Sequence, residues 1–239
     1  VSNHNLSVIS LVSIGEHPTS CRPRRAEQDA RAVGLGLKLV GESLQTLHAG
    51  QISEDPSQKI ALQSYLGMGL VDINLLEMPE NTDAVMVIAE YLKQQIPDII
   101  LTGVRAEKGE SSGMLPYLLA ENLGMAMVTS IAEILRIDEV NNQAEILQAL
   151  PGGQRRKLRI NLPFIASVDM AAAPPKQSAF GPGSRGEIAL TPGKIITHDE
   201  SSNWPSVDAK KRPQRLKIIK GKTAAERFKA ATAKASASG

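Results

Sequence analysis

The residues best suited to chemistry lie in the segment LTGVRAEKGESSG at positions 101–113. A strand is predicted to end at Gly103, and Ser111, Ser112 and Gly113 stand where a helix begins. Free backbone N–H groups and the helix dipole at such a start favour a phosphate, to which both serine hydroxyls could donate. The alternative is a serine that caps the helix, which explains the same residues without a ligand. The residue types alone leave both interpretations open.

Other motifs carry weaker signals. The segment GPGSRG at 181–186 matches G-x-G-x-x-G, but no strand is predicted before it and no helix after it, so we interpret it as a flexible loop. The chain has one cysteine, Cys21, which excludes an internal disulfide and cysteine-ligated clusters. The four histidines lack metal-ligand spacing, and Cys21 lacks an ordered set of histidine and acid partners. We therefore predict neither catalytic residues nor a metal.

The elements that position the serine-containing segment alternate between strands and helices. Short runs, mostly apolar except at 43–49, predict strands at 6–14, 43–49, 71–78 and 98–103. Helical spacing of apolar residues predicts helices at 24–41, 57–69, 82–95 and 113–124. This alternation predicts an α/β fold with a mostly parallel, doubly wound, Rossmann-like sheet of the nucleotide-binding type. Ligands of such sheets lie beyond the carboxyl ends of the strands.

The pattern changes after residue 125. Strand-like runs follow one another without helices, so we predict antiparallel strands that extend the sheet, the last of them over 163–169, with Pro151-Gly152-Gly153 as a hairpin turn. The following residues are rich in proline and glycine and lack sustained periodicity, which is typical of an irregular C-terminal arm. We divide the chain into an α/β nucleotide-binding domain at 1–169, a protruding recognition arm at 170–190 and a basic C-terminal extension at 191–239 that wraps a partner subunit.

Charge is distributed unevenly along the chain. Residues 209–239 hold ten of the 27 lysines and arginines and one of the 25 acids, which leaves a net charge of −7 on residues 1–208. A basic tail can bind nucleic acid or an anionic membrane; the other interpretation is a solvated arm or one that lies on an acidic partner. We favour the last interpretation and expect no nucleic-acid partner, because aromatic residues make up 3% of the chain and single-stranded nucleic acid needs exposed aromatic side chains.

The apolar runs also bear on the membrane. None approaches the roughly 20 residues of a membrane span, so we expect no direct membrane insertion. The first ten residues lack a secretory signal, and one cysteine fits a reducing compartment. We expect a cytoplasmic bacterial protein, with the mitochondrial matrix as an alternative.

Seven segments in order resemble the β (small) subunit of electron transfer flavoproteins. The family's first strand and loop are similar to LSVISLVSIGEHP, its Asn-Pro-Phe turn to Arg22-Pro23-Arg24, and its Cys-Gly-Pro turn to Ala49-Gly50. The family's Thr-Gly-x-Gln-Ala loop resembles Thr102–Ala106, and its Gln-Thr-Gly helix start resembles Ser111–Gly113. The signature strand and arm resemble RRKLRINLPFIASVDMAAAPPKQSAF, and the late Pro-Gln-Arg corresponds to residues 213–215.

The resemblance implies an electron carrier without catalytic activity of its own. It implies a heterodimer with an α subunit, an FAD at the subunit interface, and AMP or a second adenine nucleotide in the β subunit. The implied partners are a flavin dehydrogenase as electron donor and a quinone oxidoreductase or similar acceptor.

The resemblance also implies binding residues. It assigns the cofactor-binding positions to Ser10, His17, Arg22, Arg24, Ala49, Gly103, Val104, Arg105, Ala106, Ser111, Ser112 and Gly113. The phosphate is expected near the two serines at 111 and 112, the adenine near Ser10 and Ala49, and the isoalloxazine near His17 and Arg24. Phe180 corresponds to the anchor that docks on the dehydrogenase, with Lys176 and Gln177 beside it.

Two alternatives remain at this point. One is an adenine-nucleotide-binding protein or hydrolase of the same broad α/β superfamily that works alone. The other is a heterodimer subunit that has lost its nucleotide and is purely structural.

Overall fold

The computed structural model describes residues 6–51, 56–79, 82–109, 111–193, 205, 207, 208, 210, 211 and 223–232. The chain forms two compact units, Val1–Ser202 and Asn203–Gly239. The predicted site lies in the first unit.

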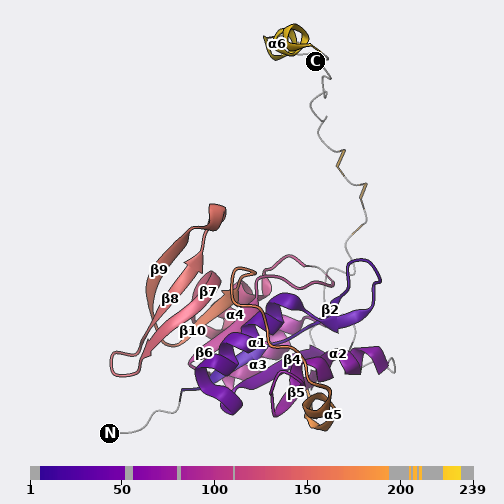
Figure 1. Cartoon of the computed structure of the whole chain (residues 1–239). Helices are drawn as coiled ribbons and strands as arrows, with labels where there is room; N and C mark the ends of the chain where they lie inside the picture. The colour runs from indigo at the N-terminus through magenta and orange to yellow at the C-terminus, as the bar shows by residue number, and fades with distance from the viewer. Residues whose placement is uncertain are drawn as a thin grey trace. The chain divides into compact units, whose positions relative to one another are not determined.

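A nine-stranded sheet with the order β11-β5-β4-β1-β6-β10-β7-β8-β9 organises the first unit (Figure 1). The bounds are β1 Val8–Leu11, β4 Gln45–Gly50, β5 Asp72–Glu77, β6 Ile99–Gly103, β7 Ala126–Asp138, β8 Gln143–Ala149, β9 Arg155–Asn161, β10 Phe164–Val168 and β11 Glu187–Pro192. Neighbours from β11 to β7 are parallel, whereas β7–β8 and β8–β9 are antiparallel. The predicted α/β fold with a mostly parallel sheet is therefore confirmed. The β8–β9 connection is a 3₁₀ turn, η2 (Pro151–Gly153), at the predicted hairpin.

Helices cover both faces of the sheet. Their bounds are α1 Glu27–Val40, α2 Pro56–Leu66, α3 Ala84–Lys93, α4 Leu115–Leu123 and α5 Phe180–Arg185, with a 3₁₀ turn η1 (Gly41–Ser43) after α1. Apolar residues of α1 and α2 share one core cluster with Val8 and Val12, and those of α3 and α4 share another with Ile9 and Leu11. Because successive side chains of a strand point to opposite faces, α1 and α2 lie on one side and α3 and α4 on the other.

A short antiparallel ribbon separates β1 from α1. It consists of β2 (Ile14–Glu16) and β3 (Pro23–Arg25), a hairpin that the sequence analysis did not predict. Gly15 allows this ribbon to lie close to the residue that precedes α1, because a Cβ at Gly15 would lie 2.9 Å from the Ala26 Cα. The ribbon thus brings residues 16–24 beside the N-terminus of α1.

The prediction for the last strand-like run was wrong in direction. We expected residues 163–169 to form an antiparallel extension, but β10 is inserted between β6 and β7 and is parallel to both. All five of its residues are buried, as is typical of a central strand in a parallel sheet. The long β7 makes this possible, because its first part pairs with β10 and its second part with β8.

The arm is more regular than the sequence indicated. Residues 180–185 form the short helix α5 and not a flexible loop, and residues 187–192 form β11, which pairs with β5 at the edge of the sheet. A Cβ at Gly183 would lie 2.8 Å from the Gln63 carbonyl oxygen, so this glycine permits the contact of α5 with α2. Pro192 fits at the end of an edge strand, where no ladder donor is needed.

The second unit contains α6 (Ala224–Thr232). Thr223 and Glu226 form a capping box: the Thr223 Oγ1 accepts from the Glu226 N–H at 3.2 Å, and the Glu226 Oε2 accepts from the Thr223 N–H at 3.3 Å. Most of the predicted basic extension, including residues 212–222, lies outside the described residues. The structure does not test its wrapping of a partner.

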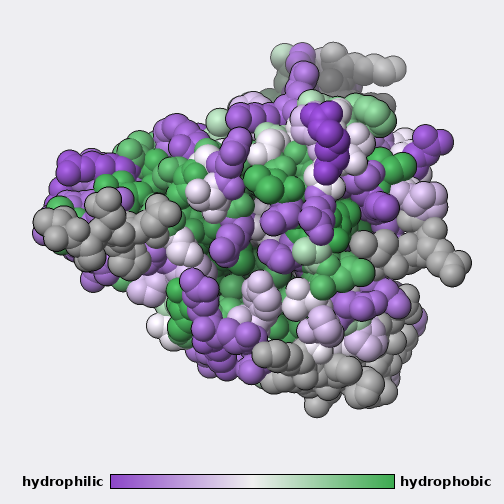
Figure 2. Space-filling view, turned by 90° about the horizontal axis from the view of Figure 1, so that it is seen from below, coloured by the Kyte–Doolittle hydropathy of each residue, from purple (hydrophilic) through white to green (hydrophobic). Residues whose placement is uncertain are grey.

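Figure 2 shows hydrophobic and hydrophilic residues interleaved over one face of the molecule. Among the described residues, no helix has the length and apolar character that crossing a membrane requires.

Candidate functional site

A ligand crevice is expected where the strand order reverses, between the carboxyl ends of β1 and β6. β1 lies between β4 and β6; the chain leaves β1 toward α1 on one face and leaves β6 toward α4 on the other. This divergence is the topological switch point of a doubly wound sheet, where ligands bind. The ribbon β2–β3 and the loop after Gly103 meet at this point, where Arg24 pairs with Glu107, and both carry residues that the sequence analysis selected.

Asp29, a buried residue in the first turn of α1, ties the two strand ends together. Its Oδ2 accepts from the Ser13 N–H at 2.8 Å and from the Ser13 hydroxyl, and its Oδ1 accepts from the Gly103 N–H at 3.0 Å. Burial raises the pKa of this carboxyl from 3.8 to about 6, while the hydrogen bonds from Ser13 oppose the rise. A carboxylate with three donors in place positions both loops without being open to a ligand.

Gln28 fixes the start of the loop that follows β6. Its Oε1 accepts from the Val104 N–H at 3.0 Å and from the Arg105 N–H at 3.1 Å. These two amides point at a side chain of the same protein, so they are not available to a phosphate in this structure. The predicted nucleotide loop is therefore shaped by α1.

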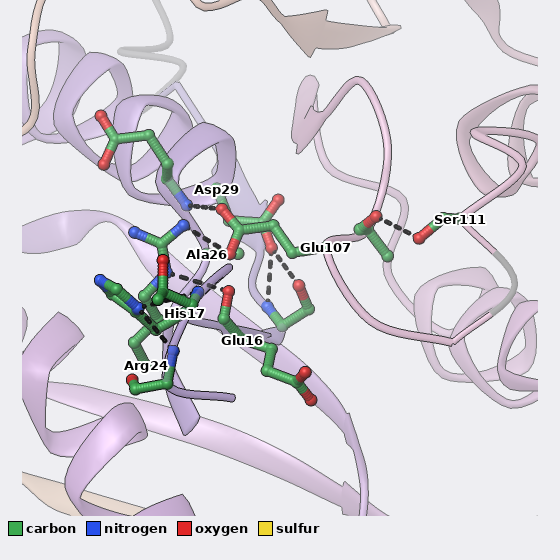
Figure 3. Close-up of polar contacts among 12 residues, drawn as sticks. Glu16, His17, Arg24, Ala26, Asp29, Glu107 and Ser111 are labelled. Carbon is green, nitrogen blue, oxygen red and sulfur yellow. Dashed lines mark hydrogen bonds and ion pairs between the residues drawn. The ribbon is translucent and has the colours of Figure 1, made fainter. Parts of the chain in front are cut away.

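Glu107 connects this loop to the ribbon (Figure 3). Its Oε1 accepts from the Glu27 N–H at 2.8 Å, at the start of α1, and its Oε2 lies 3.0 Å from the Arg24 Nη2. A carboxylate at a helix N-terminus is stabilised by the helix dipole and by free N–H groups. Glu107 thus occupies an anion position at α1, and its charge is balanced by Arg24.

Tyr65, a fully buried residue of α2, connects the end of β1 to the start of α1. Its hydroxyl accepts from the Ala26 N–H at 2.8 Å and donates to the Ser13 carbonyl oxygen at 2.8 Å. Burial, followed by the nearby charge of Asp29, raises the pKa of this hydroxyl well above 10. The group stays protonated and can act as a donor at neutral pH.

The predicted flavin-facing residues lie on the ribbon. His17 and Arg22 are exposed, and the His17 Nδ1 accepts from the Thr19 N–H at 3.3 Å and the Ser20 N–H at 3.2 Å. Arg24 is on β3, and its Nε donates to the Glu16 carbonyl oxygen at 3.3 Å, besides the ion pair with Glu107. The structure brings these three together, but Arg24 is engaged within the protein.

The predicted phosphate-binding residues follow β6. Gly103 is buried, Arg105 and Ala106 are exposed, and a Cβ at Gly113 (φ +74°) would lie 2.9 Å from the Val104 carbonyl oxygen. The loop therefore folds back on itself at this glycine.

The two serines of this loop bond within it. The Ser111 hydroxyl donates to the Ala106 carbonyl oxygen at 2.6 Å, and the Ser112 Oγ accepts from the Met114 N–H at 3.3 Å. Neither serine is the N-cap of α4, because Met114 occupies that position. The capping alternative is thus wrong in its simple form, while phosphate binding stays a prediction.

The two predicted adenine contacts differ in access. Ser10 is fully buried in the middle of β1, and its hydroxyl has no partner among the described residues. Ala49 is half-buried at the end of β4. Next to it, the His48 Nδ1 lies 2.8 Å from the Val12 carbonyl oxygen, and burial lowers the pKa of His48 from 6.5. Contact of either Ser10 or Ala49 with an adenine stays a prediction.

The predicted docking residues lie apart from the crevice, on the arm. Lys176 and Gln177 are exposed, and Phe180 is 90% exposed at the start of α5. The Ala179 N–H donates to the Gly67 carbonyl oxygen at 2.9 Å, which fixes the arm to the end of α2. Phe180 therefore projects from an anchored segment and does not pack on its own subunit.

Sequence reasoning missed the residues that hold the crevice, namely Ser13, Gln28, Asp29, Tyr65 and Glu107. One signal was available for Asp29. Ala32, Val33 and Gly36 follow Asp29 by three, four and seven positions, so all four residues lie on the same, buried face of the helix. A charged residue on that face implies a specific hydrogen-bonded role.

Fold and crevice together define a doubly wound α/β protein with its ligand position at the switch point. A family model described as the electron transfer flavoprotein domain matches residues 26–197. The chain is also 47% identical over 234 residues to the electron transfer flavoprotein subunit beta of Chromohalobacter salexigens, a match that covers 98% of this chain and 86% of that protein. The chain therefore belongs to the electron transfer flavoprotein family as a beta subunit, which confirms the resemblance.

Proposed function

We propose that this chain is half of a heterodimer that carries electrons from a flavin dehydrogenase to a quinone oxidoreductase or similar acceptor, through an FAD shared with an α subunit. The observation that carries the proposal is the similarity to a beta subunit over nearly the whole chain. The exposed tip of the ribbon at 17–22 and the anchored arm support it, because both present side chains outward for a partner. The chain acts as a carrier subunit and not as a catalyst, and we place it in the bacterial cytoplasm.

The loop after β6 fits the phosphate of AMP or a larger adenine nucleotide. Arg105 and Lys108 are exposed and form no ion pair with any described residue, and Ser112 is exposed near the start of α4. The one described acid of the loop, Glu107, is directed at α1 and balanced by Arg24, so it opposes an anion little. The positive charge of this loop attracts a phosphate, and the adenine base of the nucleotide would then lie at the ends of β1 and β4.

The ribbon fits one wall of a flavin site. A bound FAD supplies the redox chemistry, accepting and passing on one or two electrons. His17 and Arg22 are exposed there and could contact the isoalloxazine once an α subunit covers the ribbon. Arg24 would favour negative charge on a nearby ring, but its pairing with Glu107 offsets part of that effect.

The arm supplies the surface for the electron donor. Phe180 offers a large apolar side chain with few rotamers to lose, which is suitable for an anchor. Lys176 and Gln177 provide polar contacts at its base.

The experiment is purification of the chain together with its α subunit, followed by a flavin absorbance spectrum and by extraction of bound nucleotides. We expect FAD together with AMP or another adenine nucleotide. Adenine nucleotide on the chain alone, without flavin in the complex, would support the independent nucleotide-binding protein. A complex that contains neither would support a purely structural subunit.

A further inference from the structure

A concave site lies along α1, away from the loop after Gly103. A pocket of about 270 Å³ is bounded by α1, by β7 and β8, by the start of β9 and by the segment 171–176. The chain is described throughout these elements. The lining combines an apolar floor, which includes Leu35 and Leu147, with a rim of charged side chains.

The charged rim is dominated by cations. It carries Arg31, Lys38, Arg155 and Lys176, against a single acid, Glu133. The four cations come from three separate stretches of the chain, so no one helix or turn accounts for them.

Two of these cations are balanced and two are not. The Lys38 Nζ lies 2.5 Å from the Glu133 Oε1, and the Arg31 Nη2 lies 3.0 Å from the Glu27 Oε1. Arg155 and Lys176 form no ion pair with any described residue. The Arg155 Nη1 donates to the Gly153 and Gln154 carbonyl oxygens, but these are neutral groups. The pocket therefore keeps a positive field from one cation at the start of β9 and one on the arm.

Arg31 makes the wall of this pocket rigid. Its side chain is 12% exposed, and besides Glu27 it donates through Nη1 to the Ala172 carbonyl oxygen. Its Nε is buried and has no partner among the described residues. A guanidinium fixed in this way loses little freedom when an anion binds beside it.

We propose that this pocket binds a small anion that carries phosphate or carboxylate groups. The positive balance of the rim selects the charge. The volume, below the roughly 300–1,000 Å³ of sites for drug-sized ligands, restricts the occupant to a compact group such as a pyrophosphate or a sugar phosphate. The site is separate from the flavin and nucleotide positions but shares Lys176 with the proposed docking arm. The inference does not depend on the proposed electron-carrier role.

The test is calorimetric titration of the full chain with inorganic pyrophosphate at low salt. The double variant Arg155→Ala and Lys176→Ala should weaken binding on the order of tenfold, because it removes the two unbalanced charges. Glu133→Gln should tighten binding, since it removes the one acid of the rim. The matched control Arg136→Ala, an exposed arginine of β7 outside the lining, should leave binding unchanged.

Tightening by Glu133→Gln is the decisive readout, because a general structural defect would weaken binding. Absence of saturable binding, or equal weakening in the Arg136→Ala control, would overturn the proposal. A second titration uses the complex with the α subunit and separates two sources of the anion. A site for a free small anion keeps its affinity there, whereas loss of binding would show that a group of the partner fills the pocket and that the assignment is wrong.

Discussion

Replacing Asp29 by asparagine should change how the stability of the protein depends on pH. The burial of the carboxylate raises its pKa to about 6 in the folded state, from 3.8. Since the folded state holds the proton more tightly than the unfolded state, the contribution of Asp29 to the free energy of unfolding is highest below about pH 4. That contribution is lost as the pH rises through 6.

The size of the effect follows from the two pKa values. Between about pH 5 and about pH 7.5 the free energy of unfolding should fall by roughly 1.4 kcal/mol because of Asp29 alone, at 1.36 kcal/mol per pKa unit. The Asp29→Asn variant has no proton to exchange at this position and should lack this fall. The asparagine amide also directs an N–H group at the backbone N–H of Ser13 or Gly103, so two donors face each other. We therefore expect the variant to be less stable than the native chain at low pH.

Urea unfolding, followed by circular dichroism at the two pH values, measures how the free energy of unfolding of the native chain and of the variant changes with pH. The control is Asp83→Asn, because Asp83 caps α3 by accepting from the Val85 N–H at 2.9 Å and asparagine caps equally well. This control should keep the native pH dependence. A native chain and an Asp29→Asn variant with the same pH dependence would refute the argument that burial governs this carboxyl.

Three further substitutions test the contacts around the start of α1 and the role of the arm. Tyr65→Phe should lower the free energy of unfolding by about 1–3 kcal/mol in urea titrations, because it leaves the buried Ala26 N–H without its acceptor; no loss would remove Tyr65 from the account. Glu107→Gln should cost only about 0.5–1 kcal/mol by the same assay, since its ion pair with Arg24 is partly solvated; a loss beyond 3 kcal/mol would contradict this estimate of screening. Phe180→Ala should alter stability by less than about 0.5 kcal/mol, because the side chain is exposed, while it slows electron transfer from the cognate dehydrogenase in stopped-flow reduction; unchanged transfer with lost FAD would make the arm structural.

Local patterns predicted the parallel part of the fold well. The runs that became β1 and β6 are wholly buried, whereas β4 and β5 carry polar and partly exposed residues at their ends. Helical spacing of apolar residues identified the helices between them, although Ile60 of α2 is exposed. Periodicity does not specify strand order. The insertion of β10 between β6 and β7 depends on contacts across more than 60 residues of sequence, which no local signal contains.

Short elements rich in proline and glycine escaped prediction for a different reason. α5 and β11 are six residues each and stand among Pro182, Gly186 and Pro192, so their composition indicated an irregular arm. What orders them is docking: α5 packs on α2, and β11 completes the edge of the sheet beside β5. Such tertiary contacts override weak local preferences.

The elements around the candidate site could be predicted from the sequence, but the hydrogen bonds among them could not. Strand ends and the start of α4 were identified from the order of elements, and the residues of the loop after Gly103 lie there. The hydrogen bonds of Gln28, Asp29 and Glu107 could not be foreseen, because each joins residues more than 15 positions apart.

The central claim is that the chain holds flavin only as half of a heterodimer, and the FAD content of two preparations tests it most directly. The chain is expressed once alone and once together with its α subunit, and flavin per protein is measured after identical purification. The account predicts little or no flavin on the chain alone and about one FAD per heterodimer at the shared interface, as expected for a cofactor whose site is completed by a partner. A stable, yellow monomer with stoichiometric FAD would contradict it.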